Sequence, residues 1–132
     1  MDIGTYAILL RLDQPQHLVV GKLGDFLFPA GYYVYIGSAL GGLRQRLARH
    51  LKQGKLLRWH VDYLREVAEV AEAWVAVGPE RLECGWARLV GSWPGARLVA
   101  ARFGSSDCRC PAHLVYFVEK PDLSALGAQS VL

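Results

Sequence analysis

The chain has 132 residues, of which 52% are hydrophobic and 20% are charged, and its formal net charge is +3. This length and composition are typical of one globular domain that buries its core without disulfides or a metal ion, so we expect residues 1–132 to form a single domain. No apolar run approaches the roughly 18 residues that a membrane helix requires, and the N-terminus lacks the basic region of a secretory signal. We therefore expect a cytoplasmic protein with no membrane partner.

The first third of the chain predicts a meander of short strands. Apolar, β-branched and aromatic residues dominate four runs, and turn-forming residues separate them. We expect these strands at residues 4–12, 17–23, 25–29 and 31–37. The second and third form a hairpin around Gly24, and Gly37 ends the fourth because glycine adopts backbone angles that other residues avoid. A sheet of this kind leaves one face for helices to cover.

A basic amphipathic helix is predicted directly after the last of these strands. Its apolar positions fall at helical spacing, at Leu40, Leu43, Leu47 and Leu51. One stripe of the helix therefore faces a core. At about 100° per residue, Arg46 and His50 lie one turn apart on one shoulder of that stripe, where they meet the end of the strand.

Positive charge is concentrated in and after this helix. Six basic residues and no acid lie between Gly41 and Val61, whereas the other residues sum to nine basic and twelve acidic, or −3. A local basic strip on an otherwise acidic chain predicts a phosphate-bearing partner. The residues that we expect to bind nucleic acid are Arg44, Arg49, Lys52, Lys55 and Arg58. A solvated cationic face is the alternative interpretation of the same charges.

The second half of the chain predicts alternating helices and strands. We expect a short helix from residue 58 to about 68, a strand at 72–77, and a helix that starts at Gly78-Pro79-Glu80 and ends near Trp93. Glu83 belongs to the shoulder of the apolar stripe of this last helix. Further strands are expected at residues 98–103 and 113–119, with a loop between them. The elements together predict a small α/β domain with a mostly antiparallel sheet flanked by helices.

Two glycine-tyrosine motifs, Gly4-Thr5-Tyr6 and Tyr35-Ile36-Gly37, precede Arg46, His50 and Glu83 in chain order. This set resembles the GIY-YIG nuclease family, and the resemblance covers about residues 4–93. Thr5 replaces the usual isoleucine, and the 28 residues between the two tyrosines exceed the usual spacing, which we attribute to the extra hairpin. Residues 59–64, 82–84 and 106–114 look like the stand-alone, uncharacterised branch from archaea and thermophilic bacteria. The lack of asparagine is a tendency of thermophilic proteins, and a GC-rich genome gives the same bias.

The resemblance implies a metal-dependent endonuclease that hydrolyses phosphodiester bonds in DNA. Because the sequence shows no separate DNA-reading domain, we expect its specificity, for example in repair or recombination, to come from DNA shape, such as a flap or branch, or from another protein. Such a reaction needs a divalent ion, a deprotonated water and positive charge beside the phosphate. By resemblance, Glu83 holds one Mg²⁺ or Mn²⁺ ion and Arg46 binds phosphate oxygens. Tyr6 activates the water and Tyr35 helps to polarise the reacting groups. Because tyrosine has a reference pKa of about 10, His50 is an alternative proton carrier.

One departure from the family concerns its late asparagine, which has no counterpart in this chain. Either Ser106, Asp107 or His113 takes over its role, or the site is weakened. A nucleic-acid-binding module without catalysis therefore remains an alternative to the nuclease. The sequence also leaves open whether the substrate is DNA or RNA and whether a partner protein supplies the specificity.

The three cysteines, Cys84, Cys108 and Cys110, make an odd number that argues against a secreted disulfide framework. A Zn²⁺ site is conceivable from Cys108, Cys110 and His113 together with Asp107 or His60, although the usual paired spacing is missing. We expect instead a hydrogen-bonded loop that supports the cleft, made by Ser106, Asp107, Cys108, Cys110 and His113. Cys84 is then a small packed or half-packed thiol. A zinc-stabilised domain whose basic strip binds an acidic protein is a further alternative.

Overall fold

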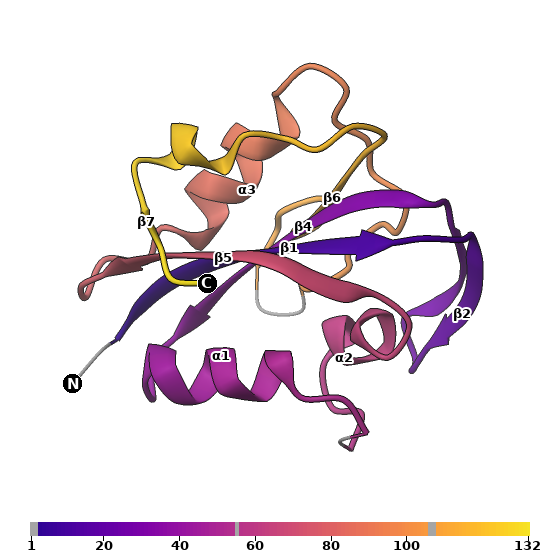
Figure 1. Cartoon of the computed structure of the whole chain (residues 1–132), viewed down its shortest axis with the longest axis horizontal. Coiled ribbons are helices and arrows are strands. Elements are labelled where there is room, and N and C mark those ends of the chain that lie inside the picture. The colour runs from indigo at the N-terminus through magenta and orange to yellow at the C-terminus, as the bar shows by residue number, and fades with distance from the viewer. Residues whose placement is uncertain (1–2, 55, 106–107) are drawn as a thin grey trace.

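A five-stranded sheet forms the centre of the computed structural model, which describes residues 3–54, 56–105 and 108–132 (Figure 1). Its strands are β1 (Gly4–Leu12), β4 (Gly31–Ala39), β5 (Glu69–Val77), β6 (Leu114–Phe117) and β7 (Gln129–Ser130). They lie in the order β6-β4-β1-β5-β7, and each neighbouring pair is antiparallel. This confirms the predicted small α/β fold with a mostly antiparallel sheet.

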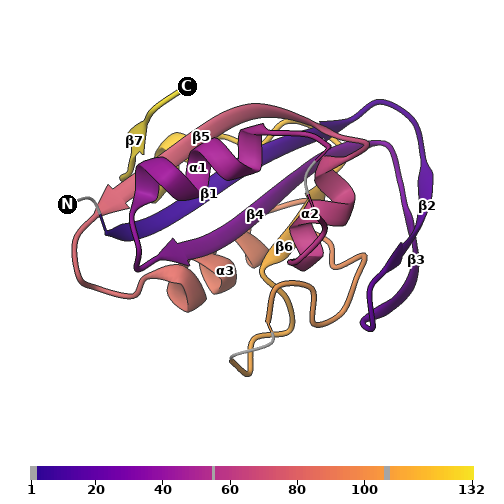
Figure 2. The same ribbon diagram turned by 90° about the horizontal axis from the view of Figure 1, so that it is seen from below.

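Strand β1 lies in the middle of the sheet because nearly all of its residues are apolar and both of its faces are covered. Tyr6, Ile8 and Leu10 belong to the core on one face, and Ala7 and Leu9 belong to the core on the other. The helices are α1 (Leu43–Leu51), α2 (His60–Arg65), α3 (Glu83–Gly91) and the short 3₁₀ helix η1 (Leu123–Leu126). Figure 2 shows that α1 and α2 cover the face opposite to α3.

The predicted hairpin exists, but its strands do not join the main sheet. β2 (Gln16–Val20) and β3 (Gly24–Phe28) pair only with each other, from Gln16 opposite Phe28 to Val20 opposite Gly24. The predicted four-stranded meander is therefore wrong in its pairing, because β4 runs back along β1 over its whole length. The hairpin extends beyond the sheet and contacts α2 (Figure 2).

Several predicted boundaries differ from the structure for local reasons. β4 continues two residues beyond Gly37, and α1 begins only at Leu43 because Gly42 has a φ of 129°, outside the helical range. α2 is shorter than predicted, so β5 begins at Glu69. α3 begins at Glu83 rather than at Gly78, which has a φ of 145°.

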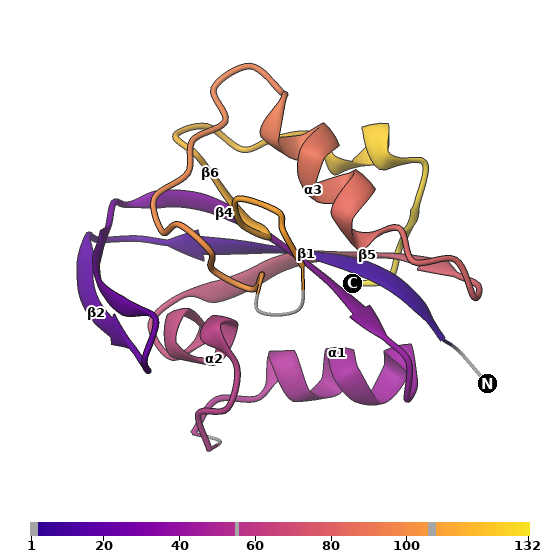
Figure 3. The same cartoon turned by 180° about the vertical axis from the view of Figure 1, so that it is seen from behind.

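The predicted strand at residues 98–103 is not formed. This segment consists of bends and turns, and Arg97 alone makes an isolated bridge to Tyr116. The long connection from α3 to β6 descends from the α3 side of the sheet toward α2 (Figure 3), where the N–H of Gly104 donates to Nδ1 of His60 at 2.8 Å. None of the helices in the described part of the chain is long and apolar enough to cross a membrane.

Candidate active site

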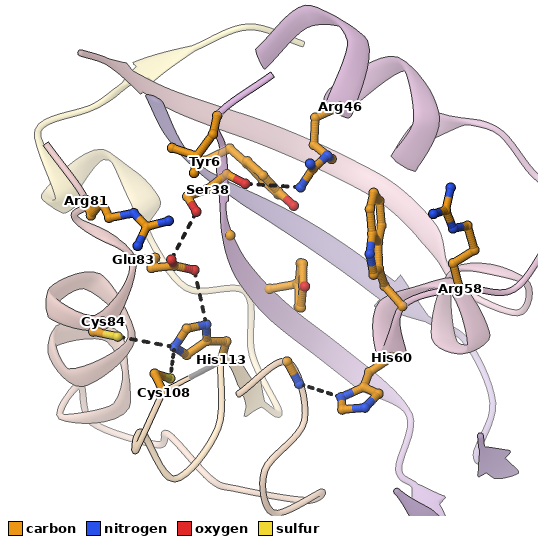
Figure 4. A pocket seen from close by; sticks show the side chains of 15 residues that line it. Tyr6, Ser38, Arg46, Arg58, His60, Arg81, Glu83, Cys84, Cys108 and His113 are labelled. Carbon is orange, nitrogen blue, oxygen red and sulfur yellow. Dashed lines mark hydrogen bonds and ion pairs between the residues drawn. The ribbon is translucent and has the colours of Figure 1, made fainter. Parts of the chain in front are cut away.

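A pocket of about 500 Å³ opens where β1 and β4 meet the two helical layers (Figure 4). Its wall is formed by side chains from β1, β4, α1 and the start of α3, by the segment that enters α2, and by the loop before β6. The described residues that line it are Tyr6, Tyr35, Gly37, Ser38, Leu40, Arg46, Arg58, Trp59, His60, Arg81, Glu83, Cys84, Gly104, Cys108 and His113. Four of the five candidate catalytic residues, Tyr6, Tyr35, Arg46 and Glu83, thus line one pocket.

Tyr6 lies on the floor of the pocket and is hydrogen-bonded to the fifth candidate, His50. Its hydroxyl oxygen is 2.7 Å from Nε2 of His50, and both side chains are almost fully buried. Burial raises the pKa of Tyr6 to about 12, although the nearby Arg46 guanidinium acts in the opposite direction. Burial also raises the pKa of Tyr35 well above its ordinary value. Both phenols therefore carry their protons at neutral pH.

The glycine of the second motif makes room for Tyr6. A Cβ atom at Gly37 would lie 2.4 Å from the hydroxyl oxygen of Tyr6, and 2.6 Å from the ring carbon that carries it. The first motif has a similar requirement, because a Cβ atom at Gly4 would lie 2.2 Å from the carbonyl oxygen of Ala76 on β5. Close approach thus explains why glycine occurs at these two motif positions.

The variant Gly37→Ala should displace the Tyr6 ring and break its hydrogen bond to His50. We expect a loss of about 1–3 kcal/mol in the free energy of unfolding, because the added methyl overpacks a buried site. Chemical denaturation measures this loss. Gly85→Ala is the matched control, since a Cβ atom at this exposed position in α3 meets nothing within 4 Å, and it should not destabilise the protein. Equal stability of both variants would contradict the close packing of Tyr6 against Gly37.

Arg46 lies on α1 with its guanidinium at the edge of the pocket. It donates to the carbonyl oxygen of Ser38 at 3.1 Å and lies 4.4 Å above the Trp59 ring. These two contacts hold the planar group in one place and leave other N–H donors for a ligand. Figure 4 shows the guanidinium close to the Tyr6 hydroxyl.

Glu83 is the first residue of α3 and points into the pocket from the side opposite to Arg46 (Figure 4). Its Oε1 accepts a hydrogen bond from the Ser38 hydroxyl at 3.0 Å, and its Oε2 is 3.6 Å from Nδ1 of His113. The start of the helix is held by Thr5, whose hydroxyl oxygen accepts the N–H of Leu82 at 3.1 Å. The threonine that replaces isoleucine in the first motif thus connects β1 directly to the helix that carries the carboxylate.

The basic residues predicted to bind nucleic acid are placed differently from one another. Arg58 lines the pocket, while Arg44 and Lys52 are exposed on α1 and just beyond it and are not among the residues that line the pocket. Lys55 lies outside the described residues. Arg49 donates two hydrogen bonds to the carboxylate of Asp62, at 2.7 and 2.9 Å, and also stacks on the Trp59 ring. Its guanidinium is therefore engaged within the protein.

Asp62 is a buried carboxylate that nothing in its local sequence pattern distinguishes. Besides the two bonds from Arg49, it accepts the N–H groups of Arg58 and Trp59, each at 2.8 Å. Burial raises its pKa, but the bonds from Arg49 and the two backbone groups outweigh burial and leave the pKa below the ordinary 3.8. This ion pair fixes the backbone segment that presents Arg58 and Trp59 to the pocket.

Sequence reasoning missed Ser38, Trp59 and Arg81 as parts of the site. Ser38 directly follows the second glycine motif, and this position was the available signal. The Trp59 ring lies against two guanidinium groups at the pocket wall, which an apolar residue near the start of a predicted helix does not indicate. Nothing in the local pattern around Arg81 indicates that it faces the same pocket.

The cysteine residues form a cluster at the α3 end of the pocket. One ligand atom from each of Cys84, Cys108, Cys110 and His113 lies within 4.8 Å of all the others, so the group could hold a metal ion. His60, which was considered as an alternative ligand, is not part of this cluster, and its Nδ1 accepts the N–H of Gly104. Ser106 and Asp107, which were expected in the supporting loop, lie outside the described residues. Cys84 is half-buried and belongs to the same cluster.

Comparison with known proteins gives a family without an assigned activity. A family model with the description "Domain of unknown function DUF123" matches residues 5–131. No curated protein matches the chain, and no solved structure matches it. The function must therefore be inferred from the chemistry of the pocket.

Proposed function

We propose that this chain, which belongs to the family described as domain of unknown function DUF123, is a metal-dependent endonuclease that hydrolyses phosphodiester bonds in DNA. The observation that carries the proposal is the convergence of Tyr6, Tyr35, Arg46 and Glu83 on one pocket of about 500 Å³. These side chains come from four separate elements, β1, β4, α1 and α3. The resemblance to the GIY-YIG nucleases rests on the same residues and supports the same reaction.

The charge of the pocket wall supports a phosphate-bearing substrate. Arg46, Arg58 and Arg81 line the pocket, and Glu83 is the one acidic residue among its described lining residues. Guanidinium groups bind phosphate oxygens through parallel N–H donors. A wall with three arginines can therefore hold the scissile phosphate and a neighbouring phosphate of the same strand.

The donor set around Glu83 fits a hard divalent cation. Its side chain is 23% exposed, and each of its two oxygens keeps a further lone pair beside the contacts to Ser38 and His113. Mg²⁺ is commonly bound through one or two carboxylates, with waters and substrate phosphates as the remaining ligands. A Mg²⁺ or Mn²⁺ ion at Glu83 would supply Lewis-acid stabilisation of the charge that develops on the phosphate. Ser38 and His113 keep the carboxylate in its orientation.

Tyr6 and His50 form the proton path of the proposed reaction. As a water oxygen bonds to phosphorus, one of its protons passes to the Tyr6 oxygen, and the Tyr6 proton passes to Nε2 of His50. The bond from phosphorus to the leaving oxygen breaks, and this oxygen takes a proton from solvent in the open pocket. Arg46 faces the negative charge on the phosphate oxygens. Because the phenol is protonated at neutral pH, the relay to His50 removes the need for a free phenolate.

A nucleic-acid-binding module without catalysis is the second candidate. The observation in its favour is the burial of Tyr6, which is 1% exposed and has a raised pKa. A phenol in this state is a poor base in the absence of substrate and metal. The arginine-rich wall would still bind a phosphate backbone in such a module.

A plasmid-nicking assay with Mg²⁺ or Mn²⁺ tests the proposal. The native chain should convert supercoiled plasmid to the nicked form, and omission of the divalent ion should stop the reaction. A panel of linear, flapped, branched and single-stranded DNA and matching RNA then identifies the preferred substrate. The binding module predicts a salt-sensitive gel shift without cleavage of any substrate, and this result would overturn the nuclease proposal.

A further inference from the structure

The cysteine cluster has the composition and dimensions of a closed zinc site. Three thiols and one imidazole are a known ligand set for structural Zn²⁺. With ordinary Zn–S and Zn–N bond lengths, a tetrahedral site places a sulfur and a nitrogen roughly 3.6 Å apart. Nε2 of His113 lies 3.7 Å from Sγ of Cys84 and 3.3 Å from Sγ of Cys108 (Figure 4). These separations match an ion placed between the ligands.

We propose that Cys84, Cys108, Cys110 and His113 bind one Zn²⁺ ion as a structural site. The ion replaces the thiol protons, which pass to solvent, and the imidazole binds through Nε2. Soft thiolate ligands select zinc against the hard ions Mg²⁺ and Ca²⁺, so this site differs in chemistry from the Glu83 carboxylate. The site depends on no assumption about catalysis.

The surrounding structure holds the ligands together from three separate segments. Cys84 lies in the first turn of α3, Cys108 and Cys110 lie in the loop, and His113 directly precedes β6. Arg102 organises the loop, because its guanidinium donates to the carbonyl oxygens of Cys108 and Cys110 at 2.7 Å each. These bonds leave the cysteine side chains available to a common centre.

Thiol chemistry without an ion explains the cluster less well. A thiol is a weak hydrogen-bond donor and acceptor, so three thiols gathered around one imidazole gain little from one another. All three cysteines are free of disulfides, and Cys110 and His113 are buried. A bound ion would compensate for the loss of hydration of these groups.

The orientation of His113 connects the proposed zinc site to the pocket. Because Nε2 faces the thiols, Nδ1 faces Oε2 of Glu83 at 3.6 Å. A carboxylate at the second nitrogen of a zinc-bound histidine is a common arrangement that fixes the ring and strengthens its bond to the metal. The zinc site would thus position Glu83 for its proposed role as a metal ligand. This consequence rests on the proposed nuclease function, whereas the zinc site does not.

The test uses the full chain purified under reducing conditions without added metal, with free thiols verified by mass spectrometry. Elemental analysis should find about one zinc per chain. After removal of zinc, Co²⁺ should produce a thiolate-to-cobalt charge-transfer band and the visible bands of a tetrahedral ion. The proposal would be overturned if the chain without substitutions contained no zinc and gave no charge-transfer band when Co²⁺ is added. This result does not depend on whether any variant folds.

Two variants with matched controls complete the test. Cys84→Ser should reduce the charge-transfer intensity by about one third, since one of three thiolates is removed, while the exposed His17→Gln should leave it unchanged. Undiminished intensity in Cys84→Ser would exclude Cys84 as a ligand.

Glu83→Ala should weaken zinc binding by about 10- to 100-fold, as is typical when a metal-bound histidine loses the carboxylate at its other ring nitrogen, while Glu80→Ala should not. Unchanged affinity would overturn the link to Glu83. Zinc binding without any nuclease activity would support the zinc site and contradict the proposed function. Cleavage by a native chain that is purified without zinc and binds neither Zn²⁺ nor Co²⁺ would support the proposed function and contradict the zinc site.

Discussion

The variants Glu83→Gln and Tyr6→Phe should each nearly abolish cleavage of DNA by this chain. Glutamine keeps the size of Glu83 but loses the charge that attracts a divalent ion, so we expect the rate to fall at least about 100-fold. Phenylalanine removes the oxygen that receives the proton of the attacking water, and we expect a loss of about 10²- to 10⁴-fold. Plasmid nicking under single-turnover conditions measures both rates.

Two control variants separate chemistry from stability in this experiment. Glu80→Gln removes an exposed carboxylate that lies outside the pocket and just before α3. Tyr116→Phe removes a hydroxyl from another buried tyrosine, one that donates to the carbonyl oxygen of Ala30 at 2.6 Å. Both controls should cleave at the native rate. Retained cleavage in folded Glu83→Gln would exclude the carboxylate as the metal ligand.

The variant Asp62→Asn should cause the largest loss of stability among the substitutions considered. The Asp62 side chain is fully buried and its Arg49 partner is 23% exposed, so removal of the carboxylate charge leaves a partly buried guanidinium without its counterion. We expect the free energy of unfolding to fall by about 3 kcal/mol. This value is at the lower end of the range for a broken buried ion pair, because Arg49 retains some contact with water. Thermal and chemical denaturation measure the change.

The pH dependence of stability provides a second measurement of the same pair. The pKa of Asp62 is lower in the folded protein than in the unfolded chain, so its contribution is fully present above about pH 4. The contribution is lost as the pH falls through the lowered pKa. Asp62→Asn should therefore differ from the native chain most at neutral pH and least in acid. Asp13→Asn, whose carboxylate is 72% exposed in a surface pair, should stay within about 0.5 kcal/mol of the native chain.

Local sequence pattern was sufficient to predict the elements that carry the candidate site. The apolar run at residues 4–12 predicts β1 with its observed ends, because a strand covered on both faces is apolar throughout. The leucine spacing predicts α1 and places Arg46 and His50 on the side of the helix that faces the pocket and Tyr6. The glycines of the two motifs indicate where β1 approaches a neighbouring strand or a side chain closely.

Contacts between distant segments decided the remaining features. By periodicity Arg49 points outward from the helix like Lys52. It nevertheless binds Asp62, and only the packing of α2 against α1 brings that carboxylate within reach. The helix predicted from residues 78–80 begins only at Glu83, because Gly78 has a φ of 145° and the N–H of Leu82, just before the helix, is bound by Thr5 on β1. Neither Asp62 nor Thr5 can be identified as a partner from the sequence of the single helix that it contacts.

The sequence by itself determined the order of strands and helices from β1 to α3 and the identity of the side chains on their inner faces. Only the tertiary structure joined Cys84 to His113 and set Glu83 between Ser38 and His113. Periodicity reports which face of an element is buried, because burial of apolar side chains recurs along that element. It does not report which faces of different elements contact one another, since that choice depends on how distant segments of the chain pack on the two sides of the sheet.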